Sequence, residues 1–484
     1  MTRPSVIFAL GPVLGIAFGF ALGLTAACGP TIKDGSGDDV DPNAPCKPGR
    51  VVSCYSGTDG TAGVGPCAKG TRTCSDQGAW GGCVGEVIPL AESCSDGVDN
   101  NCNGQTDEDI DADGDGFTTC GGDLCDSTEC TQPELVNPGA FDAPGNNLDD
   151  DCDGIVDNGA VKCDTALPNG TGQAIEYAKA IELCQQTTFS ERRWGVINTE
   201  LTLADGTGIP AARAHAIRRR FGTGVTPRSG DSLILLSTGA AAGQGDANPG
   251  YQDFQEVAEP GNNKSSPFPS DFLAANGNRL PNAPGCVGPD GNSAMDPIML
   301  TLTIRVPTNA RSFKLQTNFF SSEFPEYTCS KFNDFFVVLL DSMYTGASPN
   351  PADKNLAFYQ PMGSMQKYPV GVNLASGNTG LFTQCVNGTI GCAVGGSKTI
   401  TTCTSTAQLA GTGLDTSSSG DCNSNSLQGG GTGWLQTSGN VKPGEIIKLR
   451  IAIWDTSDHV LDSIAAIDAF EWSVDLAQPG TVIF

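Results

Sequence analysis

Residues 111–116 read D-A-D-G-D-G, the first half of an oxygen-ligand calcium loop. Carboxylates at alternate positions converge on one ion when a glycine allows the sharp turn, and Ca²⁺ takes about six to eight oxygen ligands. An EF-hand would place a bidentate Glu at the twelfth position, where this chain has Gly122. Asp123 or Asp126 would therefore close the shell. The loop carboxylates are those of Asp111, Asp113 and Asp115.

The loop lies in a strongly acidic window. Residues 84–161 contain 20 Asp and Glu and no Lys or Arg, which is -20 of the formal net charge of -27. Like charges at this density repel one another out of a compact state unless counter-ions are bound. The alternative is a solvated acidic linker without a fixed ion. A linker has no need of acids and glycines at set positions, so we interpret the window as a calcium-organised module.

An internal repeat flanks the loop. Residues 99–104 (DNNCNG) realign fifty residues later as 149–154 (DDDCDG). With the D-G-D-G-F loop and C-G-G-D-L-C-D at 120–126 between the copies, the segment 94–158 resembles the MopE-type metal-binding repeat. Leu124 and Cys130 depart from that pattern. The further candidate ligands are Asp99, Asn101, Asn103, Asp107, Asp149, Asp151, Asp153 and Asp157.

The ligand types favour one class of metal. Oxygen ligands suit hard cations, and both histidines, His215 and His459, lie outside the module. The residues themselves therefore indicate Ca²⁺. The MopE resemblance implies copper for some relatives, so copper remains the alternative.

A second acidic constellation lies in the C-terminal half. Its members follow or flank apolar runs, so they would meet at one end of a β-sandwich. We hypothesise a second calcium site that braces the loops there. The alternative is a set of turn and cap residues, because Asp and Asn favour such places for local hydrogen bonding. The residues are Glu323, Glu326, Asn333, Asp334, Asp455, Asp458 and Asp462.

An enzymatic function is not expected. His459 beside Asp458 suggests a catalytic triad, but the chain has no G-x-S-x-G nucleophile motif. Glu323 and Glu326 would be the pair for glycoside hydrolysis, yet aromatic residues make up only 7% of the chain and form no sugar-stacking cluster. An exported hydrolase is therefore a minor alternative.

The N-terminus predicts export. Arg3, an apolar run over 6–24 and small residues before Cys28 form a secretory signal over 1–27. The end resembles a bacterial lipobox, which implies lipidation of Cys28, although Thr25 stands where that family prefers Leu. Ordinary secretion or an uncleaved anchor are the alternatives. The 20 cysteines predict disulfides in an oxidising compartment, and the nineteen after Cys28 leave at least one unpaired within the chain.

The remaining chain predicts a mainly β protein: disulfide-rich, calcium-loop N-terminal modules followed by a large β-sandwich or jelly-roll-like domain with one N-terminal helix. Helical spacing of apolar residues predicts that helix within 172–185, and short apolar runs with turn residues between them predict strands. The clearest strands are 232–237, 299–306, 312–320, 335–340 and 446–454. The predicted divisions are a signal peptide 1–27, tether 28–45, Cys-rich hairpin module 46–93, acidic repeats 94–158, linker 159–173, β domain 174–476 with a Cys-rich insertion 385–433, and tail 477–484.

Two blocks carry a second resemblance. Residues 319–336 (FFSSEFPEYTCSKFNDFF) and 451–463 (IAIWDTSDHVLDS), with LLSTG at 235–239, are similar to the choice-of-anchor L domain. The resemblance covers roughly 174–475, and the insertion 385–433 departs from it. It implies an exported bacterial protein carried on the cell surface, and it implies no particular chemistry.

Together these patterns predict an exported cell-surface protein, lipid-anchored to a membrane through Cys28, with a calcium-binding stalk and a β-sandwich adhesion head. The expected location is the cell envelope, at the outer membrane or cell surface, or outside the cell if Cys28 is not lipidated. The ligand would be another surface, a matrix or a protein. The acidic balance excludes nucleic acid, because phosphate binding needs basic residues. The alternatives are an envelope copper-binding protein, a structural envelope protein and, as above, an exported hydrolase.

Overall fold

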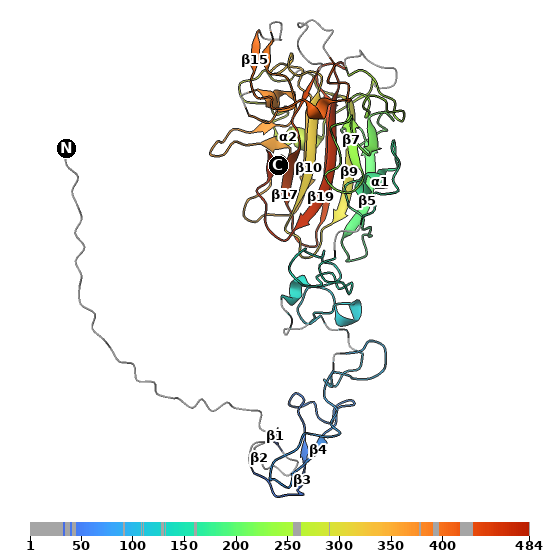
Figure 1. Cartoon of the computed structure of the whole chain (residues 1–484), viewed down its shortest axis with the longest axis vertical. Coiled ribbons are helices and arrows are strands. Elements are labelled where there is room, and N and C mark those ends of the chain that lie inside the picture. Colours follow the sequence, from blue (N-terminus) through green and yellow to red (C-terminus); the bar gives the residue numbers. More distant parts are fainter. Residues whose placement is uncertain are drawn as a thin grey trace, which may run out of the picture. The chain divides into compact units, whose positions relative to one another are not determined.

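A computed structural model shows the arrangement of the chain (Figure 1). It describes residues 45–90, 92–107, 109, 111–126, 130, 132–158, 162–254, 263–289, 291–376, 379–390, 396–416 and 429–483, and the backbone of β1 (Ile32–Lys33) and β2 (Asp39–Val40). The predicted signal peptide, Cys28 and most of the predicted tether lie outside the described residues. The chain divides into two compact units, Met1–Asp109 and Ile110–Phe484, and this boundary falls inside the predicted acidic segment 94–158.

The smaller unit contains a disulfide-stapled hairpin. Strands β3 (Val51–Cys54) and β4 (Gly70–Thr73) pair antiparallel. Three disulfides, Cys46–Cys74, Cys54–Cys83 and Cys67–Cys102, hold this region. This region has too few large apolar residues to build a hydrophobic core, so disulfides stabilise it instead. The predicted hairpin and the predicted use of cysteine in disulfides are confirmed.

The larger unit is built on two antiparallel sheets, as the sequence predicts. The first sheet has the order β20-β17-β10-β19-β7-β6, with β16 beside β10, and the second has the order β11-β18-β9-β5, with β8 beside β9. Figure 1 shows β17, β10 and β19 side by side. The first sheet comprises β6 (His215–Arg218), β7 (Leu233–Ser237), β10 (Ser312–Ser321), β16 (Gly430–Gly431), β17 (Leu435–Asn440), β19 (Ser463–Ser473) and β20 (Gly480–Ile483). The second comprises β5 (Gly195–Thr202), β8 (Ser265–Ser266), β9 (Ala294–Arg305), β11 (Phe335–Asp341) and β18 (Ile446–Asp455).

The core lies between the sheets and receives alternate side chains from both. Along β18, Leu449 and Ile451 face this core, whereas Trp454 faces a second cluster on the outer side of its sheet. Strand β11 is buried on both faces: Phe336 and Val338 enter the central core, and Phe335 joins Trp454. Period-2 alternation and short fully apolar runs are the signals from which these strands are predicted, and the structure confirms both readings.

Short strand pairs and single turns complete the larger unit. They are β12 (Phe358–Tyr359) with β13 (Tyr368–Pro369), β14 (Gly388–Ile390) with β15 (Lys398–Ile400), and 3-10 turns at Thr119–Gly121, Pro133–Leu135, Val372–Ala375 and Ala407–Leu409. The predicted tail contributes β20, which pairs with β17 at the edge of the first sheet. The Cys385–Cys403 disulfide lies in the predicted insertion.

The predicted helix is shorter than its apolar spacing indicates. Helix α1 spans Ala174–Lys179 and ends before Glu182, whose φ of 66° takes the chain out of helical geometry. The Cys163–Cys184 disulfide holds the segment that follows. A second short helix, α2 (Ser270–Ala275), packs Phe272 against Trp454 and had no clear sequence signal. None of the helices in the described part of the chain has the length and apolar character needed to cross a membrane.

Three carboxylates meet under the turn at 228–231. The backbone N–H of Arg228 donates to Asp468, that of Asp231 donates to Asp164, and Glu182 Oε1 is buried without a hydrogen-bond partner. Burial, together with the neighbouring charges of Asp164 and Glu471, raises the pKa of Glu182 to about 7, while the nearby Ser229 and Lys162 oppose the rise. The pKa of Asp468 is also raised by burial to about 7.

With EGTA present to remove bound cations, we expect Glu182→Gln to stabilise the chain at pH 8 and to change its stability little at pH 4.5. The folded pKa of Glu182 lies above its usual value, so the folded state binds the extra proton and loses stability as pH rises from about 4.5 to 7. Because Glu182 is partly exposed, we expect only about 1 kcal/mol, or about 2–4 °C in Tm at pH 8. Thermal unfolding at both pH values checks this, and an equal shift at the two values would contradict it.

Candidate metal centre

Three loops share one backbone geometry. In each, an Asp begins the pattern and a Gly stands five residues later, as in Asp99 and Gly104. The Gly φ angles are 94°, 96° and 92° at Gly104, Gly116 and Gly154. In every loop the Gly N–H donates to the first Asp at 2.9 Å. Positive φ is the region that favours glycine, so these glycines let the loop turn tightly around its carboxylates.

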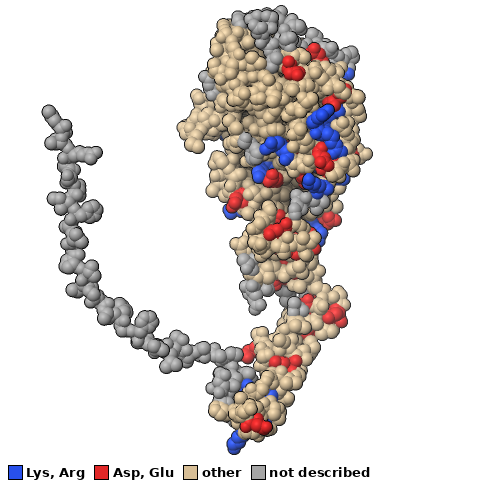
Figure 2. All heavy atoms as spheres, in the orientation of Figure 1, with Lys and Arg blue, Asp and Glu red and all other residues tan. Residues whose placement is uncertain are grey.

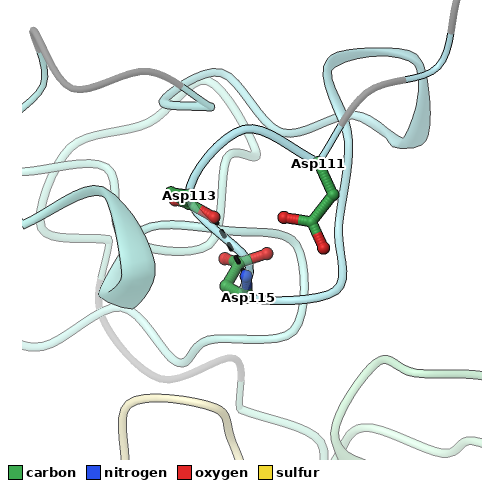
Figure 3. Close-up of side chains that lie close together, drawn as sticks. All are labelled: Asp111, Asp113 and Asp115. Carbon is green, nitrogen blue, oxygen red and sulfur yellow. Dashed lines mark hydrogen bonds between the residues drawn. The ribbon is translucent and has the colours of Figure 1, made fainter.

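The middle loop turns its three carboxyl groups toward one another (Figure 3). Asp111 accepts the N–H groups of Gly114 and Gly116, and Asp113 Oδ1 accepts the N–H of Asp115 at 3.0 Å. Oxygens of the three side chains lie within 4.8 Å of one another. Asp113 Oδ2 is buried without a hydrogen-bond partner. The loop therefore presents oxygens that its own backbone does not use.

Asp123 and Asp126 complete this centre from the next turn of the chain. Oxygens of Asp113, Asp123 and Asp126 also lie within 4.8 Å of one another, so Asp113 belongs to both groups. Asp123 is fully buried, and its Oδ2 has no hydrogen-bond partner. Burial raises the pKa of Asp123 to about 6, and the charges of Asp115 and Asp113 add to the rise. The structure thus brings together the five aspartates that the sequence assigns to the loop.

The second repeat copy forms another acidic group. Oxygens of Asp149, Asp151 and Asp153 lie within 4.8 Å of one another, and Asp151 Oδ1 is buried without a partner. Burial raises the pKa of Asp151 to about 6, with contributions from the charges of Asp153 and Asp142. Asp157 has a different role from these three residues, because its carboxylate accepts the backbone N–H groups of residues 145–147.

The first copy has the same fold with fewer charges. Asp107 closes the loop through the N–H groups of residues 96–97, the counterpart of the role of Asp157. Asp99 accepts the N–H groups of Asn103 and Gly104. Asn101 and Asn103 supply amide oxygens where the second copy has carboxylates, and both oxygens accept backbone N–H groups. This loop presents a much less negative site than the other two.

Sequence reasoning missed Asp142 and Glu92. Asp142 accepts the backbone N–H of Asp150 at 3.3 Å, and its charge acts on Asp151. Fifty residues earlier, Glu92 accepts the N–H of Asn100 at 3.3 Å. The same fifty-residue offset that reveals the repeat would have found this pair.

The part of the acidic segment that belongs to the larger unit is held to the sandwich by the turn between β9 and β10. Asn309 exchanges two hydrogen bonds with the backbone of Phe141, at 3.0 and 2.8 Å. Thr308 Oγ1 donates to Asn137 Oδ1, and Asn137 Nδ2 donates to Asp115 Oδ2 at 2.6 Å. A polar relay therefore runs from the sandwich to a loop carboxylate.

Cys152 is the free thiol among the described cysteines. It stands in the second copy where the first copy has Cys102, which is disulfide-bonded to Cys67. The N–H of Leu124 donates to its Sγ at 3.5 Å. Burial and the nearby charges of Asp123, Asp149 and Asp151 raise its pKa to about 11. The thiol therefore stays protonated at neutral pH, which disfavours it as a soft-metal ligand.

The second acidic constellation is assembled in part, at one end of the sandwich. Glu323 follows β10, Asp334 precedes β11, Asp455 ends β18 and Asp462 precedes β19. We call these four the buried carboxylate cluster. Asp458 lies nearby and acts on Glu323 and Asp334 through its charge.

The two other predicted members point elsewhere. Asn333 Oδ1 accepts the N–H of Asn373 at 2.7 Å, which is a contact between segments 40 residues apart and not the local turn or cap bond of the alternative. Glu326 is partly exposed, and its charge acts on Lys398.

Comparison with known proteins supports the assignment of the internal repeat. Residues 90–108 and 134–158, the two copies, match a family described as "Putative metal-binding motif" (Cu-binding_MopE). No curated protein and no solved structure matched the chain. The match confirms the MopE-type resemblance over 90–158, and the chain carries this motif beside a β-sandwich. The choice-of-anchor L resemblance stays a prediction.

The residues present fit a hard cation. Asp113, Asp123 and Asp151 each hold a buried oxygen without a hydrogen-bond partner, which is costly unless another group pairs with it. The clustered donors are carboxylate oxygens, the ligands that Ca²⁺ prefers. Lys and Arg on the face in Figure 2 lie mainly over the larger unit, and the window 84–161 contains none. Arg192, from outside the window, donates to the carbonyl oxygen of Gly116 in the middle loop.

Proposed function

We propose that this chain is an exported calcium-binding envelope protein whose acidic loops are ordered by Ca²⁺. The observation that carries the proposal is Asp113, which belongs to two carboxylate groups and keeps one buried oxygen unpaired. Bound cations would cancel the repulsion within the loops and hold them in the folded geometry. The loop aspartates would supply the ligands, and the chain's backbone would keep each loop closed.

Copper is the second candidate, because the matched family bears a copper-binding name and Cys152 lies between the acidic groups. The donor set argues against it. The clustered ligands are carboxylates, which favour hard ions, and the Cys152 thiol has a raised pKa.

Equilibrium dialysis of the full chain, stripped with EGTA and then exposed to Ca²⁺ and Cu²⁺ together, separates the two. We expect Ca²⁺ to be retained at the acidic loops and Cu²⁺ not to displace it stoichiometrically. Tight copper binding that expels Ca²⁺ would support the copper function instead. A Cys152→Ser variant is the matched control, because its carboxylates are unchanged and a thiol-dependent copper site would be lost.

We also propose that the protein is attached to the cell surface. Support comes from the lipobox-like sequence before Cys28, the disulfides that suit an oxidising compartment, and the resemblance of 174–475 to choice-of-anchor L domains. In this proposal the sandwich acts as an adhesion head for another surface, a matrix or a protein. The calcium-ordered segment would stiffen the connection to the membrane.

A further inference from the structure

The buried carboxylate cluster has a composition that a folded interior does not tolerate unaided. Glu323, Asp334 and Asp455 are 2%, 1% and 1% exposed. Asp462 is partly exposed as a residue, but its carboxylate is packed against Gly239, where a Cβ would lie 1.8 Å from Oδ2. Burying ionised carboxylates without partners is strongly unfavourable, so the cluster requires protons or a cation.

Four of the eight carboxylate oxygens of the cluster are left unpaired. Both Asp455 carboxylate oxygens, Glu323 Oε2 and Asp334 Oδ1 are buried without a hydrogen-bond partner. The remaining contacts are few: Ser463 Oγ donates to Asp334 Oδ2 at 2.5 Å, and Thr238 Oγ1 donates to Asp462 Oδ1 at 3.5 Å. The carboxyl groups of Asp334 and Asp455 lie within hydrogen-bond range of each other, so this pair would share a proton when no cation is bound.

Nearby positive groups do not neutralise the cluster. In the described parts of the chain, no Lys or Arg pairs with Glu323, Asp334 or Asp455. Arg213 acts at a distance on Asp462, and Lys331 acts on Asp458. His459 Nδ1 is 2.6 Å from Asp296, so it is engaged with a different carboxylate. The negative charge of Asp296 adds to that of the cluster.

From this burial and lack of partners we propose that Glu323, Asp334, Asp455 and Asp462 bind a structural Ca²⁺ inside the β-sandwich. Their oxygens do not all lie within 4.8 Å of one another, as those of the loop groups do, so the side chains would close around the ion when it binds. The site goes beyond the proposed function of the acidic loops, because none of its residues lies in the MopE-type repeats. Four carboxylates offer up to eight oxygens, which suits Ca²⁺ better than Mg²⁺, since Mg²⁺ usually keeps several waters.

The position of the site gives it a mechanical role. Glu323 and Asp462 adjoin β10 and β19 of the first sheet, whereas Asp334 and Asp455 adjoin β11 and β18 of the second. One ion bound to all four would therefore join the ends of both sheets. We infer that calcium clamps the two layers at this end and holds the loops at 322–334 and 456–462 in place.

The test compares Asp455→Asn with Glu326→Gln in the full chain at pH 7.5. Asp455→Asn removes a charge from the cluster at nearly constant volume, and Glu326→Gln removes the nearby carboxylate that faces Lys398. After EGTA stripping and dialysis against Ca²⁺, we expect Asp455→Asn to retain one ion fewer than wild type and Glu326→Gln to retain the same number. Equal ion counts in Asp455→Asn and wild type would overturn the site.

A measurement of folding stability tests the site independently of the ion count. Calcium at about 100 times the Kd of the site should raise the folded-to-unfolded ratio about 100-fold in wild type and Glu326→Gln, over any gain from the acidic loops. Asp455→Asn should lack this increment. If calcium raises the ratio equally in all three chains, the cluster is protonated in the folded state and the proposal fails.

A spectroscopic measurement covers the case in which Asp455→Asn does not fold. Trp454 adjoins Asp455, so Tb³⁺ bound in the cluster should emit when tryptophan is excited. We expect Trp454→Phe to remove most of that emission, whereas Asp113→Asn, in the acidic loops, should leave the Trp454-dependent part unchanged. Emission that does not depend on Trp454 would contradict the site. Loss of the loop ions alone would instead count against the proposed function.

Discussion

Treatment of the full chain with EGTA is expected to increase proteolytic cleavage within residues 111–158 about 100-fold. Calcium at about 100 times its Kd raises the ratio of closed to open loops about 100-fold. The rate of cleavage is proportional to the population of open loops when opening and closing are fast relative to cleavage. Without cations, the carboxylates of the middle loop and of the second copy repel one another across distances of 4.8 Å or less. The hydrogen bonds that Gly116 and Gly154 donate to Asp111 and Asp149 remain, but they do not cancel this repulsion.

The protease matters, because this segment has no Lys or Arg for trypsin to recognise. A glutamyl endopeptidase that also cleaves after Asp is suitable, with fragments identified by mass spectrometry. The hairpin held by Cys46–Cys74 and Cys54–Cys83 is the internal control, because its crosslinks do not depend on metal. Equal cleavage of 111–158 with and without EGTA would show that these loops do not depend on a metal.

The second large effect is expected from Asp113→Asn. Asp113 contributes to the group with Asp111 and Asp115 and to the group with Asp123 and Asp126. Replacing it removes one charge from both groups and should weaken calcium binding at the middle loop on the order of 100-fold. Calorimetric titration of the EGTA-stripped full chain measures the change.

Glu134→Gln is the matched control for that titration. Glu134 is exposed, lies in the same acidic segment and belongs to neither carboxylate group. Glu134→Gln removes the same unit of net charge as Asp113→Asn, so a general electrostatic effect would weaken calcium binding equally in both variants. We expect a large loss of calcium affinity in Asp113→Asn and a small loss in Glu134→Gln. Similar losses would mean that the acids act only as a diffuse charge.

Local patterns in the sequence were sufficient for the strands. The runs 335–340 and 446–454 predict β11 and β18 within one residue, because burial and period-2 alternation are local properties. The helix predicted within 172–185 ends at Lys179, because the tertiary path after α1 forces a left-handed turn at Glu182. Strand β20 was placed in a tail, since its pairing with β17 involves residues distant in sequence.

The candidate site likewise contains residues that the sequence predicts and contacts that it does not. Asp111, Asp113 and Asp115 were predictable because one short loop holds them. The relay from Thr308 through Asn137 to Asp115 joins residues far apart in the chain, so no spacing reveals it. In the buried carboxylate cluster, the positions beside strand ends predicted that the acids would gather. Spacing did not distinguish Glu323, which enters the cluster, from Glu326, which faces Lys398.

The central claim is that the acidic loops bind Ca²⁺ and are ordered by it. Calorimetric titration of the EGTA-stripped, disulfide-intact full chain with Ca²⁺, followed in parallel by circular dichroism, tests this most directly. We expect at least two ions to bind in the acidic loops, to be lost selectively in Asp113→Asn and in Asp151→Asn, and to bring a gain of ordered structure. No heat of binding and no spectral change at millimolar Ca²⁺ would contradict it and leave the acidic segment a solvated linker or a site for another metal.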